Sequence, residues 1–304
     1  KTGMRLLREN VAGFTLEGLG FHGEGLERIH HGAKQTTGMI LTTGPTGSGK
    51  TTTLYTILDI LNKPDVNIST IEDPVEYQMK RINQTQVNPD IGFTFASGLR
   101  TLVRQDPDII MVGEIRDEDT AKVAINAALT GHLVLSTLHT NNAAGTIPRL
   151  LDLGVNPKVV AGALSLSLAQ RLVRKLCENC KDVYESSEKE SRVITNILGD
   201  MKVTGKEESM GDVTLGVTYP LFKSHGCEVC SGTGYSGRIG IFEAIIMNAE
   251  IETALLTNPS EREIKKAAKS QKIPTLREDA ILKMLAGLTS FEEIAKTVDL
   301  YGEE

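Results

Sequence analysis

The chain has 304 residues, a formal net charge of −6 and 40% apolar residues, so it can bury the core of a large globular domain plus smaller modules. Aromatic residues make up 4% of the chain and tryptophan is absent. With the acidic balance, this composition argues against a protein that stacks on exposed bases or is drawn to nucleic acid or anionic lipid by charge.

The apolar segments do not predict a membrane span. The longest of them, at residues 159–173, is interrupted by Gln170 and Arg171 and is too short to cross a bilayer. No charged segment followed by an apolar one marks a secretion leader, so we expect a soluble, cytoplasmic protein. The chain begins with Lys1 rather than Met, so we also expect a piece of a longer protein, with residues 1–35 as a linker and the tail of a preceding domain.

From residue 38 onward, short apolar runs alternate with segments of helical pattern. The expected strands are residues 39–43, 66–71, 109–112 and 133–138. The expected helices are residues 51–61, 95–104 and 118–129. This alternation predicts an α/β fold in which helices cover both faces of a parallel sheet.

The second half of the chain is expected to be mainly helical. Residues 141–152 and 157–176 have helical patterns separated by turn residues. Residues 181–226 are polar and are expected to be irregular. Beyond residue 251 the apolar residues recur at helix spacing, which predicts helices to the end of the chain.

A glycine-rich segment matches the phosphate-binding pattern G-x-x-x-x-G-K-S/T between an expected strand and an expected helix. It consists of Gly44, Pro45, Thr46, Gly47, Ser48, Gly49, Lys50 and Thr51, and Thr52 follows it. The glycines let successive backbone N–H groups point at phosphate oxygens, at the positive end of the following helix. We expect Lys50 to reach the β- and γ-phosphates of ATP and the Thr51 hydroxyl to bind Mg²⁺.

Hydrolysis also needs carboxylates, and two expected strands end in them. The apolar strand at residues 109–112 is followed by Gly113 and Glu114, which resembles a Walker B element whose usual Asp is replaced by Gly113. We therefore expect Glu114 to bind Mg²⁺, through a coordinated water if not directly. The alternative is a solvated glutamate at a strand end.

The second acidic segment is Glu72-Asp-Pro-Val-Glu76, at the end of the strand expected at residues 66–71. Ligands bind at the carboxyl ends of the strands of an open parallel sheet, so this cluster is expected to face the phosphates. A carboxylate there can orient or deprotonate the attacking water. Glu72 or Asp73 could instead cap the turn.

These motifs occur in the order found in the secretion ATPases of type II secretion and type IV pilus assembly, and the chain resembles that family along nearly its whole length. The resemblance implies that Glu76 is the catalytic glutamate and Glu114 the magnesium-linked acid. It places His132 and His139 in the family's histidine box, where simple structural hydrogen bonding is the alternative role.

The resemblance also implies roles for five arginines. Four of them match residues that serve the nucleotide site or the boundary between subunits, namely Arg100, Arg104, Arg116 and Arg149. Arg5 matches an arginine supplied by the domain that precedes the core. For each of them, the alternative is an ordinary surface ion pair.

All four cysteines form two Cys-x-x-Cys pairs, Cys177 with Cys180 and Cys227 with Cys230. Four thiolates suit a closed, tetrahedral structural Zn²⁺ site, and redox-active dithiols are the alternative. In the family that the chain resembles, similar modules occur in the assembly members, whereas the pilus-retraction members characteristically lack them. The resemblance therefore favours assembly or export.

Taken together, the motifs and the resemblance predict a RecA-like ATPase core at residues 36–175, a zinc-binding module at 176–235 and a helical subdomain at 236–304. The expected activity is Mg²⁺-dependent ATP hydrolysis in a homo-oligomer, most simply a hexamer. Such a motor would act on inner-membrane platform proteins and be peripheral to that membrane. A nucleic-acid or DNA-uptake motor on the same core and an adaptor that binds ATP without turnover are the alternatives.

Overall fold

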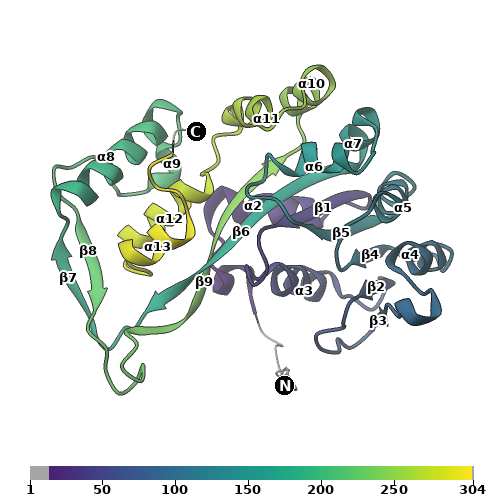
Figure 1. Ribbon diagram of the computed structural model, residues 1–304, viewed down its shortest axis with the longest axis horizontal. Coiled ribbons are helices and arrows are strands. Elements are labelled where there is room, and N and C mark those ends of the chain that lie inside the picture. Colours follow the sequence, from purple (N-terminus) through teal and green to yellow (C-terminus); the bar gives the residue numbers. More distant parts are fainter. Residues whose placement is uncertain (1–13, 303–304) are drawn as a thin grey trace.

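The computed structural model describes residues 14–302, and its main feature is a seven-stranded sheet with the strand order β3-β2-β4-β5-β1-β6-β9 (Figure 1). The strands are β1 Gly38–Thr43, β2 Ile68–Glu72, β3 Ile82–Gln86, β4 Ile109–Val112, β5 Leu133–Leu138, β6 Leu164–Leu176 and β9 Tyr235–Ile246. The first six are parallel to one another, and β9 pairs antiparallel with β6. The predicted α/β fold with a mostly parallel sheet is confirmed.

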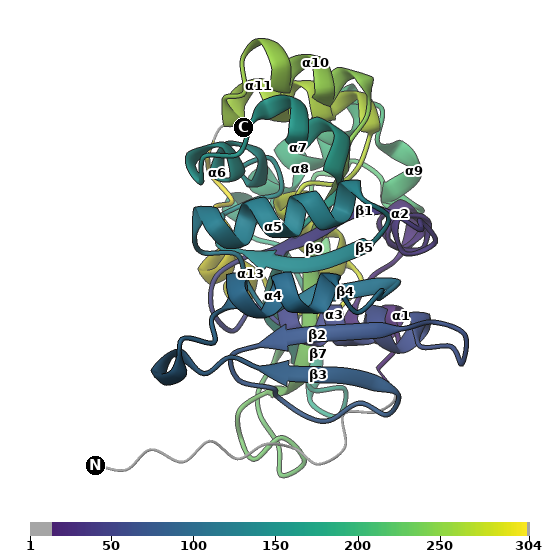
Figure 2. The ribbon, with the colours of Figure 1, turned by 90° about the vertical axis from the view of Figure 1, so that its right-hand side faces the viewer.

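Helices cover both faces of this sheet (Figure 2). On one face lie α1 Leu16–Leu19, α2 Gly23–Ala33 and α3 Lys50–Leu61, and on the other α4 Phe95–Val103, α5 Glu118–Leu129 and α7 Pro157–Ala163. The central strand β1 is buried along its whole length. Its side chains alternate between the two layers: Ile40 packs in the core that includes Leu54 of α3, whereas Met39 packs in the core that includes Ile125 of α5.

Side-chain caps mark the start of two of the helices expected in the first half. Thr94 and Ser97 form a reciprocal capping box at the start of α4. The Asp117 side chain accepts the Thr120 N–H at the start of α5. After β5, the segment expected to be helical at 141–152 contains α6 Thr146–Asp152.

The prediction of a helix at residues 157–176 is wrong over most of its length. Residues 157–176 contain the short helix α7 Pro157–Ala163, and the rest of the segment is the long strand β6. Leu164, Leu166 and Leu168 alternate with serines, which is the period of a strand. The free edge of β1 accepts this segment as its parallel neighbour.

The helical subdomain was expected to begin at residue 236, but Tyr235–Ile246 form β9 and belong to the large sheet. The remainder is helical as predicted, with α10 Ala249–Thr257, α11 Glu261–Ala268, α12 Leu276–Leu285 and α13 Phe291–Thr297. Residues 181–226, expected to be irregular, contain β7 Lys181–Glu185, α8 Glu188–Val203, α9 Glu207–Met210 and β8 Pro220–Ser224. The α8 helix begins at a capping box of Ser187 and Glu190. The proposed domain boundaries remain predictions.

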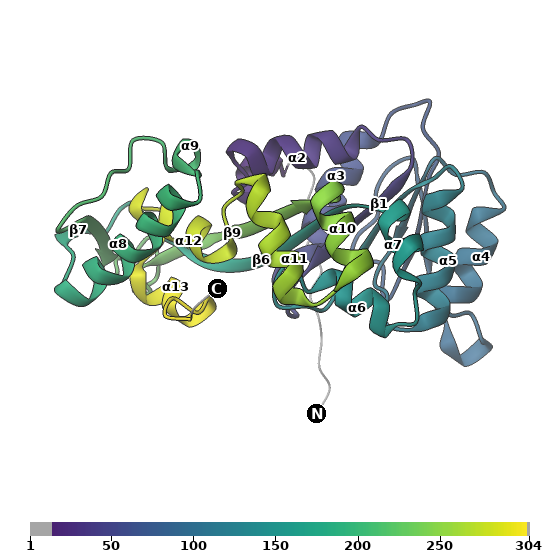
Figure 3. The ribbon, with the colours of Figure 1, turned by 90° about the horizontal axis from the view of Figure 1, so that it is seen from above.

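The strands β6 and β9 run out of the large sheet toward a second group of elements, formed by β7, β8, α8, α12 and α13 (Figure 3). One buried ion pair joins α12 to the segment after α8, and a second lies within α12 itself. Lys206 bonds both carboxylate oxygens of Glu278, at 2.9 and 2.7 Å, and Lys283 lies 2.6 Å from Asp279.

Within residues 14–302, no helix is both long enough and apolar enough to cross a membrane.

Candidate nucleotide site and cysteine cluster

The glycine-rich loop joins the end of β1 to the start of α3, and its backbone requires glycine at three positions. Gly44, Gly47 and Gly49 have φ of 148°, 80° and 89°. A Cβ atom at Gly44 would lie 2.4 Å from the Gln170 carbonyl oxygen, and one at Gly49 would lie 2.7 Å from Gln170 Nε2. At Gly47 the same atom would meet nothing within 4 Å. The loop is therefore packed against β6 on one side and open at Gly47.

Two polar side chains of the loop have capacity for a ligand. Lys50 is buried, and its ammonium donates to the carbonyl oxygens of Gly44 at 2.8 Å and Pro45 at 3.0 Å. Burial lowers the pKa of Lys50, and the nearby Glu114 carboxylate opposes this shift. The Ser48 hydroxyl is buried and has no hydrogen-bond partner within the described part of the chain. A cation, an unpaired hydroxyl and an open glycine loop fit a bound phosphate group.

Glu114 follows β4 and lies at the same edge of the sheet as the loop. Its carboxylate is 2.6 Å from Arg116 Nε and 3.5 Å from His139 Nε2. The backbone before it is fixed by two bonds of Gly113, whose N–H donates to the Ile71 carbonyl at 2.8 Å and whose carbonyl accepts from the Thr137 hydroxyl at 2.8 Å. The structure thus brings Glu114, Lys50, His139 and Arg116 together, with Thr51 and Thr52 partly exposed in the first turn of α3.

The acidic segment after β2 is divided between the core and the surface. Glu72 was expected to face the phosphates, but its carboxylate is buried and accepts hydrogen bonds from Tyr55, from Thr70 at 2.5 Å and from Gln84 at 3.3 Å. Burial raises the pKa of Glu72. Asp73 is exposed and Glu76 is partly exposed, so these two acids can reach solvent or a ligand.

The other residues implied by the resemblance lie at different distances from the loop. His132 precedes β5, at the opposite end of the strand from His139, and its Nδ1 lies 3.0 Å from the Ala127 carbonyl. This contact is the structural role that was the alternative for a histidine. Arg100, Arg104 and Arg149 are exposed and have no ion-pair partner among residues 14–302. Arg5 lies outside the described residues.

Sequence reasoning missed Gln170 and Arg171, because it placed them in a helix. On β6, the Gln170 side chain accepts from the Thr53 hydroxyl at 2.8 Å and lies behind the loop glycines. Arg171 donates to the Asn141 carbonyl at 2.7 Å, beside Gly44. The leucine–serine alternation at the start of β6 is the signal that would have found them.

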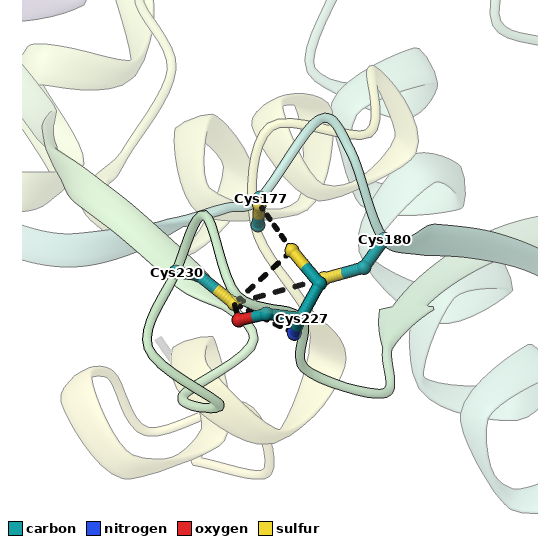
Figure 4. Close-up of side chains that lie close together, drawn as sticks. All are labelled: Cys177, Cys180, Cys227 and Cys230. Carbon is teal, nitrogen blue, oxygen red and sulfur yellow. Dashed lines mark hydrogen bonds between the residues drawn. The ribbon is translucent and has the colours of Figure 1, made fainter.

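The four cysteines form one cluster, with all four sulfurs within 4.8 Å of one another (Figure 4). The sulfur of Cys177 is 3.8 Å from that of Cys227, and the sulfur of Cys230 is 3.8 Å from that of Cys180 and 3.7 Å from that of Cys227. A tetrahedral Zn²⁺ site with Zn–S bonds of about 2.3 Å has S···S edges of about 3.8 Å. The cluster therefore fits Zn²⁺ in both ligand type and spacing.

Backbone groups favour a thiolate in this cluster. The N–H groups of Cys227 and Gly234 donate to the Cys230 sulfur at 3.1 and 3.2 Å. These bonds, the one from Cys227 first, lower the pKa of Cys230 to about 6. Burial acts in the other direction on Cys180 and raises its pKa to about 12.

A glycine-rich loop at the carboxyl end of a central parallel strand, opening a helix, is the mark of the P-loop nucleotide-binding proteins, and the chain is of this class. A family model described as "Type II/IV secretion system protein" matches residues 1–296. The chain belongs to this family, which confirms the resemblance read from its motifs.

Curated relatives agree with this assignment. The type IV pilus assembly ATPase PilB of Thermus thermophilus is 46% identical over 300 residues, covering 98% of this chain and 32% of that protein. The type II secretion system protein E of Dickeya dadantii is 43% identical over 293 residues, covering 96% of this chain and 55% of that protein. The chain thus spans 32% and 55% of the length of these two relatives.

Solved structures share this fold. The crystal structure of the pilus retraction motor PilT with bound ADP matches 95% of this chain and 68% of its own chain, with a TM-score of 0.65 and 28% sequence identity. The ATPase DotB of Legionella pneumophila matches 93% of this chain with a TM-score of 0.63 and 23% identity, which supports the fold alone.

Proposed function

We propose that the chain is the catalytic part of a Mg²⁺-dependent ATPase that powers type IV pilus assembly or type II secretion. The observation that carries this proposal is the open glycine loop with the buried Lys50, at the same edge of the sheet as Glu114, whose carboxylate raises the pKa of Lys50 against the effect of burial. The names of the relatives, pilus assembly ATPase PilB and secretion system protein E, support the choice of process.

Each site residue then has a defined task. The backbone of the loop and the Lys50 ammonium hold the β- and γ-phosphates of ATP. The Thr51 hydroxyl and Glu114 would hold Mg²⁺, which supplies charge neutralisation on the phosphate oxygens when bound. Glu76 takes a proton from the attacking water, and His139 and Arg116 orient the Glu114 carboxylate.

The remaining arginines act between subunits of a homo-oligomer, which we propose to be a hexamer. The exposure of Arg100, Arg104 and Arg149, which lie on or at the end of α4 and α6, supports a role at such a boundary. Arg5 serves the same site from the preceding segment. An arginine supplied from a neighbouring subunit typically raises phosphoryl-transfer rates by about 10³–10⁵, so specific activity should rise with protein concentration.

The partners that fit this function are the inner-membrane platform proteins of a pilus or secretion machine, approached from the cytoplasm. The acidic net charge and the low aromatic content of the chain argue against nucleic acid as a partner. Stimulation of ATP turnover by DNA or RNA would favour the nucleic-acid motor, and tight ATP binding without phosphate release would favour the adaptor.

Replacing Glu114 by glutamine tests the proposed function directly. The variant should need about 10- to 100-fold more Mg²⁺ for half-maximal phosphate release, which is the usual effect of losing a carboxylate next to a metal. Phosphate release is measured against Mg²⁺ concentration. The matched control is Glu118→Gln, a change to an exposed glutamate four residues further along the chain. An unchanged Mg²⁺ requirement in Glu114→Gln would remove Glu114 from the metal site.

For the cysteine cluster, we propose one structural Zn²⁺ bound by Cys177, Cys180, Cys227 and Cys230. Purified protein should contain about one zinc per chain, and Cys227→Ser should release it and make residues 176–235 sensitive to proteolysis. Metal content is measured by atomic spectroscopy on protein never exposed to chelator. Val229→Ser is the control, since it introduces the same residue at an exposed position between two ligands. Zinc-free wild-type protein would contradict the assignment.

A further inference from the structure

A buried tyrosine joins the phosphate-binding helix to the acidic loop after β2. Tyr55 lies on α3 four residues after Thr51, on the same side of the helix. Only 1% of its surface is exposed. Its hydroxyl donates a hydrogen bond to the Glu72 carboxylate and accepts one from the backbone N–H of Glu76, at 3.4 Å. One oxygen atom therefore connects the nucleotide-binding helix with the residue proposed as the base.

The Glu72 end of this connection is fixed by the core of the protein. Thr70 lies two residues earlier on the same face of β2, and its hydroxyl donates to Glu72 at 2.5 Å. The carboxylate has no ion-pair partner within the part of the chain that the structure describes. Burial accordingly raises its pKa, and neutral donors satisfy it. Glu72 is thus a fixed anchor for the Tyr55 hydroxyl and has no direct access to a nucleotide.

The far side of the loop is held by Gln84 of β3. Its amide nitrogen donates to the Tyr77 carbonyl at 3.1 Å and to the Tyr55 hydroxyl at 3.4 Å, and its amide oxygen accepts the Met79 N–H at 2.7 Å. The Tyr77 ring packs edge-on against the Tyr55 ring, with 4.6 Å between centroids. The backbone on both sides of the Glu76 side chain is therefore attached to Tyr55 and Gln84.

We propose that Tyr55, anchored by Glu72, is a positioning residue. It fixes the position of the loop after β2, which carries Glu76, relative to the phosphate-binding helix α3. This inference rests on the proposed role of Glu76 as the base. A phenylalanine at position 55 would fill the same apolar space, so packing alone does not account for a hydroxyl here. A buried hydroxyl is costly unless its hydrogen bonds are made, and this one makes them to both segments that the reaction needs.

Replacing Tyr55 by phenylalanine removes the connection and keeps the ring. We expect kcat to fall about 10- to 100-fold, because displacement of a catalytic group by about 1 Å costs this much. The Kd for ATP should stay within about twofold of wild type, since the phosphate-binding loop is untouched. The control is Tyr77→Phe, which removes a hydroxyl from the partner ring but not from the network, and its kcat should match wild type.

A double variant separates positioning from simple loss of structure. If Tyr55 acts through Glu76, then Tyr55→Phe combined with Glu76→Gln should be no slower than Glu76→Gln alone. A further fall in rate in the double variant, or a loss of ATP affinity equal to the loss of kcat, would overturn the proposal. Glu72→Gln, which keeps the shape of the anchor, should give the same pattern with a smaller fall in kcat, and it serves if Tyr55→Phe folds poorly.

The outcomes also distinguish this inference from the proposed function. If Tyr55→Phe has the kcat of wild type and Glu76→Gln has a strongly reduced kcat, only the positioning role is refuted. A wild-type kcat in Glu76→Gln would refute the assignment of the base, and the positioning role with it.

Discussion

Lys50→Ala is expected to abolish useful ATP binding. The lysine is the cation of the loop, and its ammonium already lies against the Gly44 and Pro45 carbonyl oxygens, within reach of a phosphate cradled there. Truncating one partner of a buried charge pair costs about 2–5 kcal/mol, which corresponds to about 30- to 3,000-fold in Kd. Titration calorimetry with Mg·ATP measures the change.

Lys63→Ala is the matched control for this experiment. Lys63 is exposed just beyond the end of α3, so its loss removes the same charge without touching the loop. Its Kd for ATP should equal that of wild type. An unchanged Kd in Lys50→Ala would show that the glycine-rich loop is not the nucleotide site.

Glu76→Gln is expected to leave ATP binding intact and to lower kcat by about 10²–10⁴, the usual contribution of a general base. An amide has nearly the shape of the carboxylate but cannot take a proton from water. Single-turnover phosphate release, measured with ATP bound beforehand, isolates the chemical step.

Asp73→Asn shows whether the position matters or only the local charge. Asp73 is the exposed acid three residues earlier, so its replacement changes the charge near the site by the same amount. Its kcat should stay close to that of wild type. If kcat falls in Asp73→Asn but not in Glu76→Gln, the base has been assigned to the wrong acid.

The fold around the loop was predictable because its signals are local. A strand, the glycine pattern and a helix follow one another without interruption, and the capping residues Thr94 and Asp117 mark the next helices. The path of β6 was not predictable in the same way. Its leucine–serine alternation has the period of a strand but covers only the first residues, and no Gly or Pro separates them from α7. Pairing with the free edge of β1 extends the strand beyond this short signal.

The orientation of Glu72 needed long-range information. Alternation along β2 puts Ile68, Thr70 and Glu72 on one face, which the sequence does indicate. Which layer covers that face depends on α3, and the partner atom comes from Tyr55. The prediction that Glu72 faces the phosphates is therefore wrong, whereas Asp73 and Glu76 are accessible to solvent.

The cysteine pairs illustrate the same limit. Their spacing predicts a metal site, but 46 residues separate Cys180 from Cys227 in the sequence. The antiparallel pairing of β6 with β9 brings them together, because Leu176 lies opposite Tyr235 at the end of the ladder. Cys177 and Cys230 are thus placed by the far ends of two strands that sequence reasoning did not assign.

The strands β6 and β9 form a two-stranded ribbon that extends beyond the other strands of the large sheet. β6 pairs with β1 only up to Ala169, whereas its pairing with β9 continues to Leu176. In this ribbon Gln170 lies against the phosphate-binding glycines, and Cys177 follows the last residue of β6 at the far end. Seven residues of strand span about 23 Å, so a tilt of about 5° at Gln170 moves the cysteine end by about 2 Å. Zn²⁺ bound by the four cysteines would link the ends of the two strands, so that a displacement at Gln170 would be carried by both strands together.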